Sequence, residues 1–261
     1  MTPKIAIPSF PGCNGEVDNM KTLRRCGFDC FVFRWNDSLE KLRDIDGYIF
    51  GAGFSYEDRG RSGMVAARDP LFRFMHEEAK KGKVIIGNCN GAQVLIESGL
   101  VPLGDRLRMC LAHNATKEGD HWKSPGFLNQ WVWVKRTCDH LRCATADWDG
   151  VLHMPIAHGE GRFTTKDPEL IAELEASGQL AFKYCDAEGG LSEHAPVTPN
   201  GSMLGVAGIC STRSLGYAKW FVEELRMYGN VTDMYIVFQI DQRKLAFNNK
   251  IVPLSFINPP D

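Results

Sequence analysis

The sequence has no long apolar run and no excess of charge of one sign. Nowhere do 18 apolar residues stand together, and the opening M-T-P-K-I-A-I-P lacks the basic and apolar regions of a secretory leader. Thirty Lys and Arg residues stand against 32 Asp and Glu residues, a net charge of -2, so we expect no nucleic-acid and no membrane partner. We therefore expect a cytoplasmic globular protein that acts on a small molecule or together with another protein.

Motifs for metals and nucleotides are also missing. No two of the nine cysteines have the C-x-x-C spacing, so no metal site is expected. The phosphate-binding pattern G-x-x-x-x-G-K-[ST] does not occur, so we expect no cofactor in this chain. The cysteines are odd in number and stand mostly among apolar residues, as at Cys26 and Cys30, which indicates reduced core thiols and not a disulfide framework.

Short apolar segments alternate with helical ones along the chain. We expect strands at 4–9, 28–33, 47–50, 84–86, 130–135 and 151–157, and helices at 19–26, 69–81, 93–98 and 167–177. All-apolar strands that alternate with helices indicate an α/β fold with a doubly wound, mostly parallel sheet. There is no repeat and no clear linker, so we expect one domain over residues 1–261.

A cysteine stands between glycines directly after the expected strand 84–86. In G-N-C-N-G, Gly87 and Gly91 leave room for a tight turn from strand to helix, with Cys89 exposed at the sheet edge. The N-terminus of the following helix would favour the thiolate and offer a backbone N–H to an oxyanion. The alternative is a small core thiol, because unpaired cysteines are among the most buried residues.

Two further loops carry small and polar residues at strand ends. G-A-G-F-S at 51–55 can aim backbone N–H groups, that of Gly53 above all, at the oxyanion of a tetrahedral intermediate. A-H-G-E-G-R at 157–162 reads as a loop that contacts substrate, or as a solvated turn with a packed histidine. Ligands of doubly wound folds bind beyond the carboxyl ends of the strands, where these loops are expected.

With these loops, the chain resembles the class I glutamine amidotransferase family of flavodoxin-like architecture, and within it the glutaminase subunits of phosphoribosylformylglycinamidine synthase, an enzyme of purine biosynthesis. The blocks that carry the resemblance are F-P-G-C-N (10–14), A-G-F-S-Y-E-D (52–58), G-N-C-N-G-A-Q (87–93), P-I-A-H-G-E-G (155–161), P-N-G-S (199–202) and A-G-I-C (207–210). Their order and spacing cover residues 4–210, which is far more specific than one G-x-C-x-G motif.

The resemblance implies a catalytic role for Cys89, which would attack the side-chain amide of L-glutamine, form a thioester and release ammonia. Gly53 and Asn90 would form the oxyanion hole. The implied substrate-binding residues are Phe54, Gln93, His158, Gly159, Glu160 and Gly161. The ammonia would pass to a separate synthetase subunit of phosphoribosylformylglycinamidine synthase, on which ATP and Mg²⁺ are expected.

The segment after residue 210 departs from the family. The family pattern completes the triad with H-P-E shortly after A-G-I-C, but no histidine follows His194 here. Loss of such a base would cost roughly 10²–10⁴ in rate. Three explanations stay open: His158 or His194 substitutes, or the chain is a non-catalytic glutamine-binding or scaffolding homologue, or residues after about 211 derive from a shifted reading frame.

The C-terminal segment 211–261 is atypical for the family, yet it has elements of its own. A helix is expected at 217–227 and a strand at 234–240. A further alternative for the whole chain is a protease-like or chaperone-like relative that shares only the turn at the cysteine.

Overall fold

The computed structural model describes residues 2–102, 106–139, 149–211, 246–247 and 250–251. The expected helix at 217–227 and strand at 234–240 lie outside these residues. The helices are α1 (Glu16–Arg25), α2 (Leu71–Lys80), α3 (Asn90–Glu97) and α4 (Pro168–Ala176). The strands are β1 (Lys4–Ser9), β2 (Asp29–Arg34), β3 (Gly47–Phe50), β4 (Val84–Gly87), β5 (Cys110–Ala112), β6 (Thr116–Glu118), β7 (His121–Lys123), β8 (Leu128–Arg136), β9 (Val151–His158), β10 (Arg162–Thr164), β11 (Phe182–Cys185), β12 (Val206–Gly208), β13 (Ala246–Phe247) and β14 (Lys250–Ile251).

The amino-terminal half forms a parallel sheet in the order β2-β1-β3-β4. All four residues of β4 are buried, as expected of a strand covered on both faces. The chain leaves β1 toward β2 on one side and later places β3 on the other side. This reversal is the topological switch point of a doubly wound fold, so the expectation of an α/β fold with a parallel sheet is confirmed.

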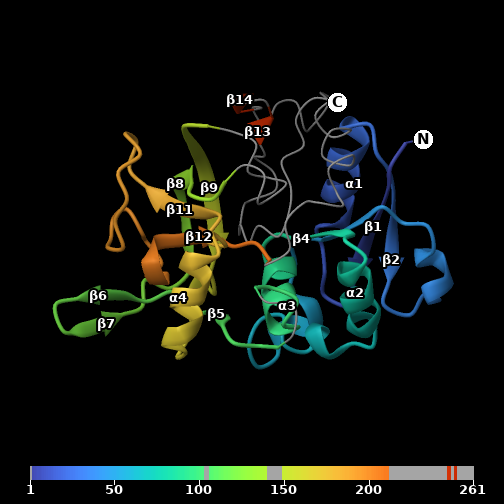
Figure 1. The fold of residues 1–261 in the computed structure, drawn as a ribbon, viewed down its shortest axis with the longest axis horizontal. Coiled ribbons are helices and arrows are strands. Elements are labelled where there is room, and N and C mark those ends of the chain that lie inside the picture. Colours follow the sequence, from blue (N-terminus) through green and yellow to red (C-terminus); the bar gives the residue numbers. More distant parts are fainter. Residues whose placement is uncertain (1, 103–105, 140–148, 212–245, 248–249, 252–261) are drawn as a thin grey trace.

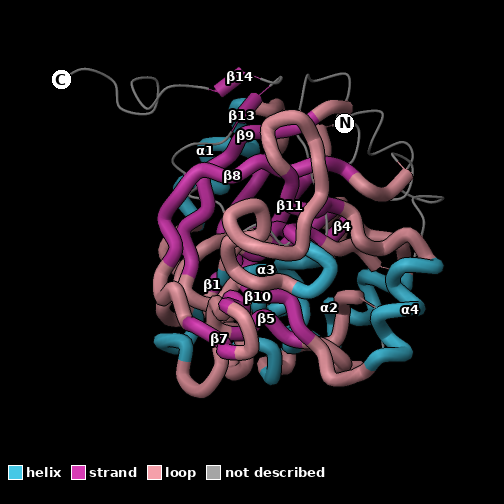
Figure 2. Tube along the Cα trace, turned by 90° about the vertical axis from the view of Figure 1, so that its left-hand side faces the viewer, coloured by secondary structure: helices cyan, strands magenta, loops and turns pink. Residues whose placement is uncertain are grey.

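The carboxyl-terminal half differs from a continued parallel sheet. A second sheet has the order β12-β11-β8-β9, and each described pair in it is antiparallel. Figure 2, which faces this half, shows β8 and β9 as long paired strands with β5 and β10 below them. The alternation of exposed and buried residues that would have marked these antiparallel strands is weak, because β9 is at least partly buried along its whole length.

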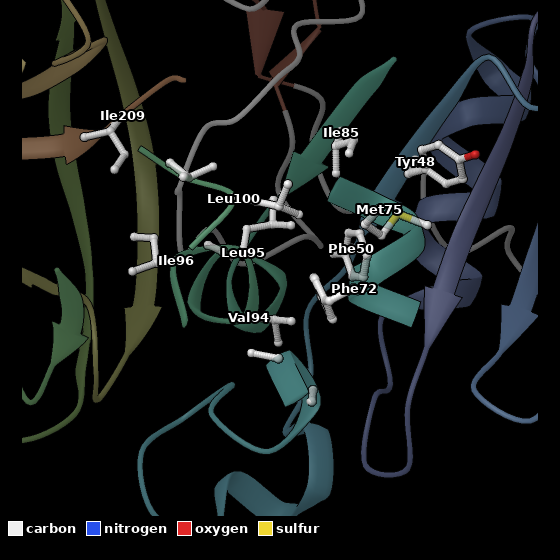
Figure 3. Close-up of a cluster of buried hydrophobic side chains, with 14 of the residues drawn as sticks. Tyr48, Phe50, Phe72, Met75, Ile85, Val94, Leu95, Ile96, Leu100 and Ile209 are labelled. Atoms are coloured by element: carbon white, nitrogen blue, oxygen red, sulfur yellow. The ribbon is translucent and has the colours of Figure 1, made fainter. Parts of the chain in front are cut away.

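Helix α3 lies between the two halves of the molecule (Figure 1). All eight of its residues are buried, and its apolar side chains pack in different directions. Figure 3 shows Leu95 and Leu100 near Ile85, while Ile96 points toward Ile209 of the other half. A helix that is buried all round has protein on every side, so α3 joins both halves into one core.

The charged residue at the carboxyl-terminal end of α3, Glu97, is paired with an arginine. Glu97 is 1% exposed, and its carboxylate accepts hydrogen bonds from the guanidinium of Arg61, with Nη2 to Oε2 at 2.9 Å. Arg68 Nη1 donates to the carbonyl of Glu97 at 3.1 Å. Arg61 thus compensates the buried charge of Glu97, and Arg68 satisfies a carbonyl at the end of the helix; both arginines come from the segment between β3 and α2.

No disulfide joins the eight cysteines that the structure describes. Within the described ranges, no helix has the length and apolar character needed to cross a bilayer.

Gly91 sets how closely α3 approaches β3. A Cβ atom at Gly91 would lie 2.0 Å from the carbonyl oxygen of Phe50 and 2.4 Å from its carbon. The N–H of Gly91 donates to the Gly51 carbonyl at 2.9 Å, and the N–H of Asn88 donates to the Phe50 carbonyl at 3.0 Å. The turn between β4 and α3 is therefore fastened directly to the backbone of β3.

We expect Gly91→Ala to lower the free energy of unfolding by about 1–3 kcal/mol, because the added methyl meets rigid backbone and the helix must shift. Urea-induced unfolding measures this loss. Gly159→Ala is the matched control, since its methyl would meet only Phe127 Cδ2 at 3.8 Å. Equal stability of the two variants would contradict the close-contact explanation.

Candidate active site

Cys89 occupies a strained turn between β4 and α3. Its backbone has φ 53° and ψ −119° at the N-cap of α3, a region that costs a residue other than glycine about 1–3 kcal/mol. Such strain, held by surrounding structure, is the signature of a nucleophile turn. The side chain is half-buried, so the thiol is neither enclosed in the core nor fully solvated.

The helix begins three residues earlier than expected, at Asn90 instead of Gln93. The reason is that Cys89 ends the turn, so that helical backbone follows it directly: the carbonyl of Cys89 accepts the N–H groups of Ala92 at 3.1 Å and Gln93 at 3.3 Å. The N–H of Asn90 belongs to the first turn of α3, whose amides have no partner inside the helix. It is therefore placed beside Cys89 as a donor to an anion.

The turn after β3 lies against the loop after β1. Gly53 has φ +143°, and a Cβ atom there would lie 2.6 Å from Cys13 Cα, so this backbone needs a glycine. The N–H of Phe54 donates to the Gly12 carbonyl at 2.9 Å, and the N–H of Gly15 donates to the Ala52 carbonyl at 3.2 Å. Phe54 itself is 56% exposed.

Hydrogen bonds join this turn and α3 to residues 158–161, the H-G-E-G loop. The N–H of Ser55 donates to Asn90 Oδ1 at 3.0 Å. Gln93 Nε2 donates to the Glu160 carbonyl at 2.9 Å, and Glu160 Oε2 accepts the N–H of Ser62 at 3.1 Å. Of the residues proposed from sequence, the structure thus brings Asn90, Gln93 and Glu160 together with the turn that contains Gly53.

Asn114 shapes the H-G-E-G loop. Its Nδ2 donates to the His158 carbonyl at 2.9 Å, and its Oδ1 accepts the N–H of Gly161 at 3.3 Å. Its own N–H donates to the Gly159 carbonyl at 3.0 Å. With 1% of its surface exposed, Asn114 fixes both ends of the loop from inside.

Asn200 and Ser202 hold the same loop from the other side. Asn200 Nδ2 donates to the Gly161 carbonyl at 2.9 Å, and Ser202 Oγ donates to the same oxygen at 3.4 Å. Both residues belong to the P-N-G-S block, to which sequence reasoning gave no role. Asn114 was missed altogether, because the A-H-N-A stretch around it matches no motif.

His158 is a buried histidine with a local partner. It is 3% exposed, and its Nδ1 lies 3.1 Å from Asn114 Oδ1. Burial lowers the pKa of His158 to about 4, so the imidazole is neutral at physiological pH. That basicity is poorly matched to proton transfer near neutral pH.

His194 lies in the loop after β11. It is exposed and lines a surface hollow with Tyr184, Leu191 and Leu204. Its carbonyl accepts the N–H of Thr198 at 3.0 Å, which makes the local turn. Among the described hydrogen bonds, none connects the His194 side chain to α3, to the Gly53 turn or to the H-G-E-G loop.

The described residues offer no gathering of three or more His, Cys, Asp and Glu side chains that would hold a metal. The chemistry that the arrangement offers is that of a thiol beside backbone donors.

Comparisons with known proteins point to the same chemistry. The model of the CobB/CobQ-like glutamine amidotransferase domain matches residues 2–215. A protein of Methanothrix thermoacetophila named phosphoribosylformylglycinamidine synthase subunit PurQ is 38% identical over 209 residues, which are 79% of this chain and 80% of that protein. A protein of that name from Thermus thermophilus is 36% identical, over 80% of this chain and 83% of its own length.

A solved structure shares the fold. The structure of PurLQS from Thermotoga maritima superposes with a TM-score of 0.62 at 24% identity, over 87% of this chain and 97% of the matched one. The family model spans the parallel sheet, the turn at Cys89 and the H-G-E-G loop alike. The chain therefore belongs to the CobB/CobQ-like glutamine amidotransferase family.

Proposed function

We propose that the chain is the glutaminase subunit of phosphoribosylformylglycinamidine synthase. The observation that carries the proposal is the strained Cys89 at the N-terminus of α3, placed next to the glycine turn after β3. The names of relatives that match four-fifths of the chain supply the reaction. They favour this function over a protease-like or chaperone-like relative that shares only the cysteine turn.

In the proposed reaction, the thiolate of Cys89 attacks the side-chain amide carbon of L-glutamine. The carbonyl oxygen becomes an oxyanion, which the N–H groups of Gly53 and Asn90 stabilise. Collapse of the tetrahedral intermediate breaks the carbon–nitrogen bond, and ammonia leaves once its nitrogen takes up a proton. Water then attacks the thioester and releases glutamate, which returns the thiol.

We infer the position of the substrate from the resemblance to the family. Phe54, Gln93 and the segment His158–Gly159–Glu160–Gly161 would surround glutamine at its amino-acid end. The ammonia would pass to a synthetase partner, where ATP and Mg²⁺ act in the step that forms the amidine.

The second candidate function is a glutamine-binding subunit without turnover. It is favoured by the absence of any histidine after residue 194 and by the low basicity of the buried His158. The family pattern would place its base beyond residue 211, and residues 212–245 lie outside the described structure.

We expect Cys89→Ala to reduce glutamate release to background when glutamine and the synthetase partner are present, since no acyl-enzyme can form. Cys110→Ala is the matched control, because Cys110 is also half-buried but lies in β5. If the parent releases no more glutamate than Cys89→Ala, the catalytic function is wrong and the binding function stands.

His158 makes stability depend on pH in a defined window. Its pKa is near 6.5 when unfolded and about 4 when folded, so the unfolded state binds more protons between these values. Stability is then fully present above pH 6.5 and is lost as the pH falls toward 4. We expect the parent to lose roughly 2–3 kcal/mol more than His158→Gln between pH 7 and 4.5.

Urea unfolding at the two pH values measures this difference. His194→Gln serves as the control, because it makes the same replacement at an exposed position outside the H-G-E-G loop. A His158→Gln variant with the same pH dependence as the parent would show that His158 is not held neutral by burial.

A further inference from the structure

We propose that the Asn90 side chain is a positioning residue that holds the two halves of the oxyanion hole in register. One half is the N–H of Asn90 on α3, and the other is the turn after β3 with Gly53. This inference rests on the proposed glutaminase function, and it assigns to Asn90 a role beyond its backbone donor.

The amide of Asn90 makes three hydrogen bonds. Its Oδ1 accepts the N–H of Ser55 at 3.0 Å, two residues after Gly53. Its Nδ2 donates to Asp58 Oδ1 at 3.1 Å and to Gln93 Oε1 at 2.9 Å. Two of these partners, Ser55 and Asp58, lie on the turn after β3, so one side chain ties that turn to the start of α3.

Burial makes these bonds specific for asparagine. Asn90 is 1% exposed, so a lost partner would not be replaced by bulk water. The site needs one acceptor toward Ser55 and two donors toward Asp58 and Gln93. An aspartate has the same shape but no donor, and its charge would face the carboxylate of Asp58.

The contacts of Asn90 continue to the H-G-E-G loop. Gln93 accepts from Asn90 through Oε1 and donates to the Glu160 carbonyl through Nε2 at 2.9 Å. Because Gln93 Oε1 accepts from Asn90, its Nε2 is the amide atom that faces the H-G-E-G loop. A substitution at position 90 is therefore expected to displace the oxyanion donors directly, and the H-G-E-G loop only through Gln93.

The expected effect is on the transition state. Loss of one oxyanion donor costs an enzyme about 10²–10³ in rate, and misplacement by about 1 Å costs a comparable factor of about 10². Since Cys89 is unchanged, its intrinsic thiol reactivity should be retained.

The experiment compares two electrophiles on the full chain. A chloroketone analogue of glutamine requires the oxyanion hole, because its carbonyl oxygen occupies the hole while Cys89 Sγ forms the carbon–sulfur bond and chloride leaves. Iodoacetamide alkylates the same sulfur with loss of iodide and needs no hole. Peptide mass mapping assigns each modification to Cys89.

We expect Asn90→Asp and Asn90→Ala to slow alkylation by the chloroketone at least about 10-fold, and Asn90→Ala to leave alkylation by iodoacetamide little changed. The urea midpoint of both variants falls, because buried groups lose their hydrogen-bond partners. Asn129→Ala, on the exposed part of β8, is the control and should label like the parent. The double variant Asn90→Asp/Asp58→Asn returns a donor to the pair and should recover part of the rate.

Two results would overturn the inference. In the first, both variants at position 90 react with the chloroketone as fast as the parent. In the second, both electrophiles slow equally, which would place the effect on the thiol or the fold. Failure of the proposed function is distinguishable, because the parent would then release no more glutamate than Cys89→Ala, whereas the inference is judged by the ratio of the two alkylation rates.

Discussion

The contact on which the site depends is the close approach of α3 to β3. Gly91 brings helix backbone against the Phe50 carbonyl, where a Cβ would lie 2.0 Å away. This contact leaves no room for a wider turn, so the chain must reverse between Gly87 and Gly91, and Cys89 takes up its positive φ. The strain at one residue, about 1–3 kcal/mol, is offset by burial of the whole helix.

A second consequence concerns the two sheets. The nucleophile turn and the glycine turn belong to the parallel sheet, whereas the H-G-E-G loop follows β9 of the antiparallel sheet. Gln93 joins the two through the Glu160 carbonyl. Since α3 begins directly after Cys89 and also packs in the core between the halves, the packing of the two halves and the geometry of the site depend on the same helix.

Features of the fold that depend on residues close together in the chain could be predicted from the sequence. The strand 47–50 is predicted to the residue, because an apolar run stops at glycines, and the turn at Cys89 follows from its flanking glycines. Asn114 and Asn200 were not predictable, since each acts through backbone carbonyls far away in sequence. The antiparallel arrangement of β8, β9 and β11 was also missed, because β9 is at least partly buried along its whole length and shows little of the alternation that marks an antiparallel strand.

The proposed function separates the covalent capture of glutamine from its turnover. Attack on the amide needs a thiolate and oxyanion donors, and in the proposed function the N-terminus of α3 and the glycine turn would supply both. Release of ammonia needs a proton, and the buried His158, with its pKa lowered to about 4, is a poor source near neutral pH. The lost proton transfer, about 10²–10⁴ in rate, would slow the cycle while leaving the first covalent step available to Cys89.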